Sequence, residues 1–131
     1  MRTASLMLGV VFFSAAFANG QKVESEGKAW LTQHTQLAEI NVNGVWQSGD
    51  WGKVTLAQAE GSREVSGEGD GWDITGVVSG KAVVLLFSSK GKISYSAELL
   101  AEGEKTLKGT YSKSLMKPNS KKKPMLLVKQ G

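Results

Sequence analysis

Three glycines interrupt segments of this chain that otherwise have the composition of β-strands. Each lies two positions after an apolar residue, in Val65-Ser66-Gly67, Ile74-Thr75-Gly76 and Leu107-Lys108-Gly109. Glycine weakens the interior of a strand, so it is expected where a sheet bends sharply or where another backbone comes close. Since side chains alternate along a strand, each glycine shares the face of the apolar residue before it. The recurrence predicts a sheet that coils into a barrel, with inward-facing glycines that either relieve crowding or leave a hollow.

The spacing of turn residues predicts the number and order of the strands. From residue 41 onward apolar residues alternate with polar ones, and turn residues recur at the spacing of an all-β meander. Asp70-Gly71 is a favoured hairpin pair. The expected strands are 42–48, 52–58, 63–68, 72–79, 82–88, 92–100, 105–112 and 124–129. Because the links between them are short, we expect an all-β, eight-stranded antiparallel up-and-down meander that closes into a small barrel.

One face of these strands collects the side chains that we expect to fill the interior. They are Trp46, Val54, Leu56, Val65, Trp72, Ile74, Val83, Leu85, Phe87, Ile93, Tyr95, Ala97, Leu99, Leu107 and Tyr111. The strand at 82–88 is apolar on both faces, which predicts cover by another element or by a partner. Ahead of the barrel, the spacing of Trp30, Leu31, His34, Leu37 and Ala38 predicts a short amphipathic helix.

The start of the chain has the parts of a secretory signal. Arg2 precedes the apolar run 6–13, and Ala16-Phe17-Ala18 offers small residues where a signal peptidase cleaves. The run is too short to span a membrane, and the chain has no cysteine with which to form disulfides. We expect a secreted or periplasmic protein with a cleaved signal peptide at 1–18, a flexible mature N-terminus at 19–28, and a single β-barrel domain with its leading helix at 29–131.

The two halves of the chain carry opposite charge. Residues 19–80 hold four basic and nine acidic side chains, a net charge of −5, whereas residues 81–131 hold eleven basic and three acidic ones, a net charge of +8. The densest basic stretch is the segment before the last strand, which contains Lys113, Lys117, Lys121, Lys122 and Lys123. These lysines either keep the loop soluble and protect the last strand, or dock on an anionic envelope surface. The loop has no stacking aromatic residue, so we expect no nucleic-acid partner.

Catalytic and metal-binding patterns are weak. His34 is the one histidine, and the chain has neither a cysteine nor a G-x-S-x-G motif to supply an activated nucleophile. Glu68, Asp70 and Asp73 gather around one turn, but their spacing is not that of an EF-hand, and Asp-Gly is a common hairpin turn. We therefore expect no enzymatic activity, no bound metal and no other cofactor.

Two segments resemble the lipocalin and avidin families, the calycin barrels. Gly44-Val45-Trp46 has the G-x-W spacing in which a tryptophan closes one end of the barrel, and Leu107-Lys108-Gly109-Thr110-Tyr111 is similar to the L-x-G-T-Y motif of avidin-like strands. The resemblance implies structural roles for Gly44 and Trp46. Lys129 stands where many lipocalins have an arginine over the tryptophan, and the biotin-binding set of avidins is not recognisable.

Closure, export and the missing catalytic groups together predict a binding protein. A barrel of eight strands either fills with side chains or holds one small ligand. We expect a small apolar ligand, or an anionic envelope component, and assign ligand binding to Trp46, Trp72, Phe87, Tyr95 and Tyr111, with Trp51 at the rim. The alternative is a protein-interaction or inhibitor module that uses Val84 and Leu86 as an exposed apolar patch.

Overall fold

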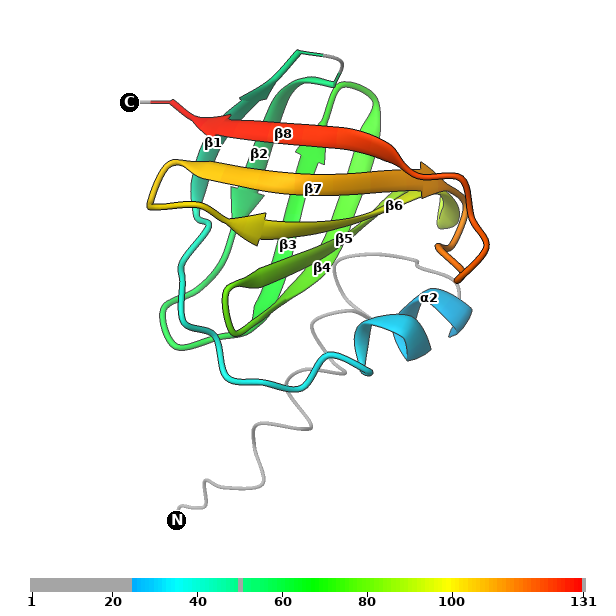
Figure 1. Ribbon diagram of the computed structural model, residues 1–131, viewed down its shortest axis with the longest axis horizontal. Helices are drawn as coiled ribbons and strands as arrows, with labels where there is room; N and C mark the ends of the chain where they lie inside the picture. Colours follow the sequence, from blue (N-terminus) through cyan, green and yellow to red (C-terminus); the bar gives the residue numbers. More distant parts are fainter. Residues whose placement is uncertain (1–24, 50, 131) are drawn as a thin grey trace.

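The computed structural model describes residues 25–49 and 51–130 and shows a closed barrel (Figure 1). Helix α2 (Ser25–Leu31) precedes eight strands, which are β1 (Gly44–Ser48), β2 (Gly52–Ala57), β3 (Glu64–Gly69), β4 (Trp72–Ser79), β5 (Ala82–Ser89), β6 (Lys92–Ala101), β7 (Thr106–Lys113) and β8 (Lys123–Lys129). Each strand pairs antiparallel with the next, and β8 pairs with β1. The predicted fold class is confirmed. The expected signal peptide at 1–18 and residues 19–24 of the expected flexible terminus lie outside the described residues.

The three glycines of the strand motifs allow neighbouring strands to approach closely. Each pairs across the ladder with a buried leucine: Gly67 with Leu56, Gly76 with Leu85 and Gly109 with Leu99. A β-carbon on any of the three would overlap the main-chain carbonyl oxygen of the residue before that leucine, which is Thr55, Val84 or Glu98. The space at each glycine is therefore occupied by backbone and is not available to a ligand.

Side chains fill the middle of the barrel as the alternation predicts. One cluster joins the inward residues of all eight strands, including Trp46, Leu85, Phe87 and Leu127. Ile93 is an exception, because it lies on the outer face. The register of β5 and β6 shifts where Phe87 pairs with Tyr95 but Ser88 pairs with Ile93, so β6 carries one extra residue. Such a bulge reverses the alternation beyond it, which makes the prediction of an inward Ile93 wrong.

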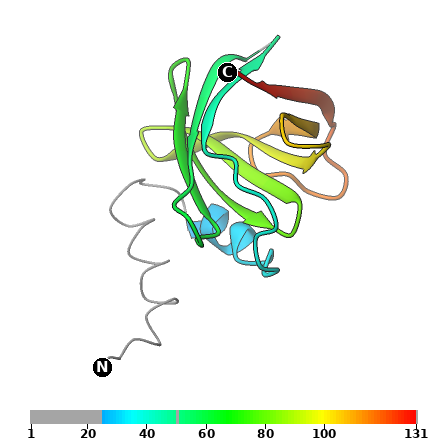
Figure 2. The same cartoon turned by 90° about the vertical axis from the view of Figure 1, so that its left-hand side faces the viewer.

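Helix α2 covers the outer face of the sheet (Figures 1 and 2). Leu31 is fully buried in a second cluster with Val77, Val84, Leu86 and Ile93 from β4, β5 and β6. This cover explains why β5 is apolar on both faces, as expected for a strand beneath another element. Val84 and Leu86 are thus at most 2% exposed, and the expectation that they form an exposed apolar patch is wrong.

Helix α2 begins and ends earlier in the chain than the apolar spacing of residues 30–38 predicted. It covers Ser25–Leu31, so it starts within the segment expected to be flexible and ends where the apolar spacing of 30–38 was to continue. Beyond it, the backbone pairs with the β4–β5 turn: the Glu39 N–H donates to the Gly80 carbonyl at 2.8 Å, and the Gly80 N–H donates to the Leu37 carbonyl at 2.9 Å. These hydrogen bonds replace helical ones and leave the Leu37 side chain 83% exposed.

Alanine at Gly109 tests the close approach of β6. We expect Gly109→Ala to lower the free energy of unfolding by about 1–3 kcal/mol, because the new methyl group would force the Glu98 carbonyl away. Gly49→Ala is the matched control, since a β-carbon there meets nothing within 4 Å, and it should stay within about 0.5 kcal/mol of the wild type. Urea unfolding followed by circular dichroism measures both. Equal stability of the two variants would contradict the close approach.

Candidate functional site

The five residues expected to bind a ligand are divided between the two ends of the barrel. Trp46 lies beside Val42 and Lys129, at the end closed by the segment that leads into β1. Trp72, Tyr95 and Tyr111 lie at the other end, which carries the β1–β2 turn, the β3–β4 turn and the β7–β8 loop. Phe87 is fully buried beneath them. The five side chains therefore do not form one site.

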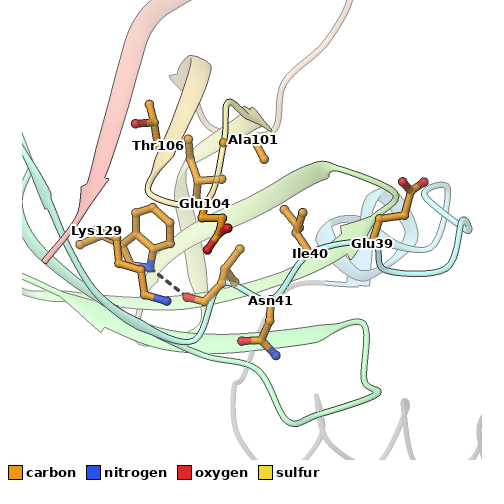
Figure 3. A pocket seen from close by; sticks show the side chains of 11 residues that line it. Glu39, Ile40, Asn41, Ala101, Glu104, Thr106 and Lys129 are labelled. Carbon is orange, nitrogen blue, oxygen red and sulfur yellow. Dashed lines mark hydrogen bonds between the residues drawn. The ribbon is translucent and has the colours of Figure 1, made fainter. Parts of the chain in front are cut away.

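At the closed end of the barrel, hydrogen bonds hold Trp46 and the segment that precedes β1 in place (Figure 3). Trp46 is 2% exposed, its indole N–H donates to the Val42 carbonyl at 2.9 Å, and the Lys129 Nζ lies 5.9 Å from its ring centroid. The Gln58 amide holds the segment in place: its oxygen accepts the Val42 N–H at 2.8 Å, and its nitrogen donates to the Ile40 carbonyl at 3.2 Å. A hollow of about 320 Å³ remains outside Trp46, but the polar atom of that tryptophan is already paired.

The open end is organised around Trp51, which leaves the β1–β2 turn and reaches over the core. Its ring centroid lies 4.6 Å from that of Phe87, 5.0 Å from Tyr95, 5.1 Å from Tyr111 and 6.3 Å from Trp72. Its indole N–H is buried and has no hydrogen-bond partner among the described residues. Trp51 is thus the centre of the cluster and not only its rim, as the sequence pattern suggested.

A hollow of about 280 Å³ opens above these rings. It is lined by Trp51, Asp70, Trp72, Tyr95 and Tyr111, and we call it the aromatic hollow. The Tyr95 ring stands at 89° to both tryptophan rings, and the Tyr111 ring stands at 89° to that of Trp51. Rings at such angles contact one another edge to face, so their faces point in different directions.

A second hollow adjoins the first and is lined with lysines. It measures about 420 Å³, and we call it the lysine hollow; its lining is Tyr95, Tyr111, Ser112, Lys113, Ser120, Lys121 and Lys123. Lys113 pairs with Tyr95 and Lys123 pairs with Tyr111, so these lysines share the inward face of the tyrosines. Two tyrosines therefore connect an aromatic surface to a cluster of positive charges.

Ser112 and the β7–β8 loop shape the lysine hollow. Ser112 is 3% exposed, and its hydroxyl has no hydrogen-bond partner within the described parts of the chain. The loop is held over β6 because the Ser114 N–H donates to the Ser94 carbonyl at 2.7 Å and the Met116 N–H donates to the Ser96 hydroxyl at 2.8 Å. Ser112 pairs with Ser96 on the face of β7 opposite to Tyr111 and Lys113, so its hydroxyl lies on the outer face and the charged donors of the hollow are its three lysines.

The two charged halves of the sequence become opposite sides of this mouth. Asp70 lies in the β3–β4 turn, flanked by the exposed Glu68 and Asp73, and the lysines lie on β7, on β8 and in the loop between them. In a closed barrel of eight strands in sequence order, these two hairpins are separated by half the circumference. The mouth therefore has an acidic side and a basic side, with the aromatic rings between them.

The sequence pattern predicted only some features of this site. Lys113 was predicted only as a member of the basic stretch, and its place beside Tyr95 follows from the register of β6 with β7. Lys122, which the charge run included, does not line the hollow, whereas Lys121 and Lys123 do. The alternation of side chains along strands could not place Trp51, because this residue lies in a turn.

The remaining candidates do not assemble into a reactive centre. His34 packs edge-on against Trp30, with ring centroids 5.7 Å apart. Within residues 25–49 and 51–130, no three His, Cys, Asp or Glu side chains are grouped to hold a metal ion, and no helix is long and apolar enough to cross a membrane. Comparisons of the chain with protein-family models, with curated proteins and with solved structures found no match.

Glu64 is a carboxyl group with a clearly shifted pKa. It pairs with Val77 on the outer face that α2 covers, and one of its oxygens is buried without a hydrogen-bond partner among the residues described. Burial raises the pKa of Glu64 from 4.5 to about 7, although the Arg63 guanidinium acts in the opposite direction. The folded protein therefore holds this proton at a pH where the unfolded chain has lost it.

This shift makes stability depend on pH between about 4.5 and 7. Because the folded state binds the extra proton, stability falls as the pH rises through this window and levels off above it. We expect Glu64→Gln, which mimics the protonated form, to remove that fall. Thermal unfolding midpoints of both proteins, measured from pH 4.5 to 8, check this. Parallel curves for the two proteins would show that Glu64 does not carry the effect.

Proposed function

We propose that this chain is an exported, non-enzymatic binding protein that holds a small ligand at the open mouth of its barrel. The apolar part of the ligand lies against Trp51, Trp72, Tyr95 and Tyr111, and an anionic group lies among Lys113, Lys121 and Lys123. The observation that carries the proposal is that Tyr95 and Tyr111 line both hollows. A single small molecule can therefore contact the aromatic rings and the lysines at once.

The position of the ligand follows from the packing of the core. The inward residues in the middle of the barrel are buried against one another, and the glycine positions are occupied by neighbouring backbone. An apolar ligand that enters the barrel axis would have to displace this core, whereas the mouth is already hollowed. Lys113, Lys121 and Lys123 supply charged donors for the anionic group, and hydrogen bonds between charged partners are the stronger ones.

We further propose that the chain is a member of the calycin group. The eight-stranded up-and-down barrel is the architecture that the lipocalin and avidin resemblance implies. Trp46 of the G-x-W segment lies at the closed end, paired in register with Lys129, whose Nζ lies over its ring. A lysine in that place supports the resemblance, because it supplies the cation that an arginine supplies in many lipocalins.

Export is tested by the mass of the mature protein. We expect full-length chain expressed in a Gram-negative host to be recovered from the periplasm or medium with residues 1–18 removed, so that it begins at Asn19. Intact-mass spectrometry of the released protein measures the cleavage point. Protein that keeps Met1 and stays with the cells would contradict export.

The binding proposal is tested with 3,3-dimethylbutyl phosphate, which joins a compact apolar group to a phosphate. We expect saturable binding by isothermal titration calorimetry, and weaker binding of inorganic phosphate or 3,3-dimethylbutanol alone. The double variant Lys113→Gln with Lys123→Gln should lose about tenfold or more in affinity, because charge-assisted hydrogen bonds are removed.

The matched control removes two charges from the same loop outside the hollow. Lys117→Gln with Lys122→Gln lowers the net charge equally, but neither residue lines the lysine hollow. We expect its affinity to stay near that of the wild type, and both double variants to unfold at the wild-type temperature. An equal loss of affinity in the two double variants would show that binding is due to general charge attraction and not to the lysine hollow. The absence of saturable binding of the phosphate ester would overturn the proposed function.

A further inference from the structure

We propose that the ligand of this mouth is zwitterionic, with a quaternary ammonium group in the aromatic hollow and a phosphate in the lysine hollow, as in a phosphocholine group. This inference rests on the proposed function, which already assigns an apolar part and an anionic part to the ligand. It adds that the apolar part carries a positive charge. Three features of the mouth carry this step: the arrangement of the rings, the carboxylate beside them and the distribution of charge.

The rings of the aromatic hollow are arranged as a cage. Two tryptophans and two tyrosines line about 280 Å³, and their planes stand at 57° to 89° wherever Trp51 or Trp72 meets a ring of this set. A planar ligand would need two parallel ring faces, which this set does not offer. A compact, rounded group with methyl surfaces can contact several ring faces at once, and a positive charge on it is attracted by the electron-rich faces of the rings.

Asp70 supplies the charge that a neutral apolar group would not need. It is the one charged residue among the five that line the aromatic hollow. A carboxylate beside aromatic rings disfavours the binding of a purely hydrocarbon ligand, because such a ligand would remove water from the carboxylate and offer it no hydrogen bond in return. The same carboxylate stabilises a bound cation through attraction.

The two hollows are close enough for one small molecule to reach both. Tyr95 and Tyr111 line both hollows, so the cationic and anionic subsites are adjacent. Lys113, Lys121 and Lys123 would repel a simple cation, whereas a ligand with its own phosphate satisfies them. A zwitterion is therefore the class of ligand that leaves neither side of the mouth unpaired.

The test compares phosphocholine with 3,3-dimethylbutyl phosphate, in which a carbon atom replaces the positive nitrogen and the shape is unchanged. We expect phosphocholine to bind about five- to thirtyfold more tightly by isothermal titration calorimetry. Asp70→Asn and Trp72→Leu should each reduce this ratio toward one. Asp73→Asn is the matched control, because it removes the same charge from the neighbouring strand without lining the hollow, and it should keep the ratio.

The outcomes separate this inference from the proposed function. Equal affinity for the two compounds would overturn the zwitterion and leave the binding function standing, whereas failure of both compounds to bind would overturn both. Loss of the ratio in Asp73→Asn as well as in Asp70→Asn would also overturn the cage, since the effect would then be one of overall charge. Thermal unfolding of each variant shows whether the fold is retained, and Asp70→Asn, in an exposed turn, keeps the test independent of Trp72.

A vesicle-binding experiment distinguishes two sources of the phosphocholine group, a lipid headgroup and a free small molecule. Sedimentation with phosphatidylcholine vesicles that soluble phosphocholine reverses would support a lipid headgroup as the ligand. Binding of soluble phosphocholine without sedimentation would support a free small molecule. Both results uphold the zwitterionic site, and sedimentation that phosphocholine does not reverse, without binding of soluble phosphocholine, would overturn it.

Discussion

Close approach of backbone to backbone at three glycines is the constraint on which this barrel depends. The contacts lie between β2 and β3, between β4 and β5, and between β6 and β7. They therefore fall at every second junction around the closed sheet, and the fourth such junction is the short β8–β1 pairing that completes the ring. Curvature distributed in this way lets eight short strands close without an exposed edge.

Tight coiling has a consequence for function, because it removes the room for a ligand in the centre. Each glycine faces a leucine, and these leucines fill the middle of the core. The hollows are left at the ends, where the strands diverge and the turns supply side chains of their own. One end is closed by Trp46 and the Gln58 hydrogen bonds, so the other end is the place where a turn residue such as Trp51 can build a site.

Local patterns predicted the strands well, since the period of two and the turn residues are properties of neighbouring residues. Local patterns did not predict the bounds of helix α2 or the shift in the register of β6. Pairing of the segment after Leu31 with the β4–β5 turn is a contact across some forty residues, and one extra residue at Ser94 is invisible to a strict alternation. The candidate site was predictable in aromatic residues and in Lys121 and Lys123, which line its lysine hollow. Its place in the barrel was not, because Trp46 and Trp72 share a face but lie at opposite ends, which the closed topology decides.

Closure also explains why the opposite charges of the two halves matter. In an up-and-down barrel, position along the chain becomes position around the circumference, so a sequence with an acidic first half and a basic second half acquires two charged sides. The β3–β4 turn and the β7–β8 loop open at the same end, and the aromatic rings lie between them. Charge that would merely aid solubility on an open sheet therefore lies on opposite sides of one mouth, where it can attract the two ends of a dipolar ligand.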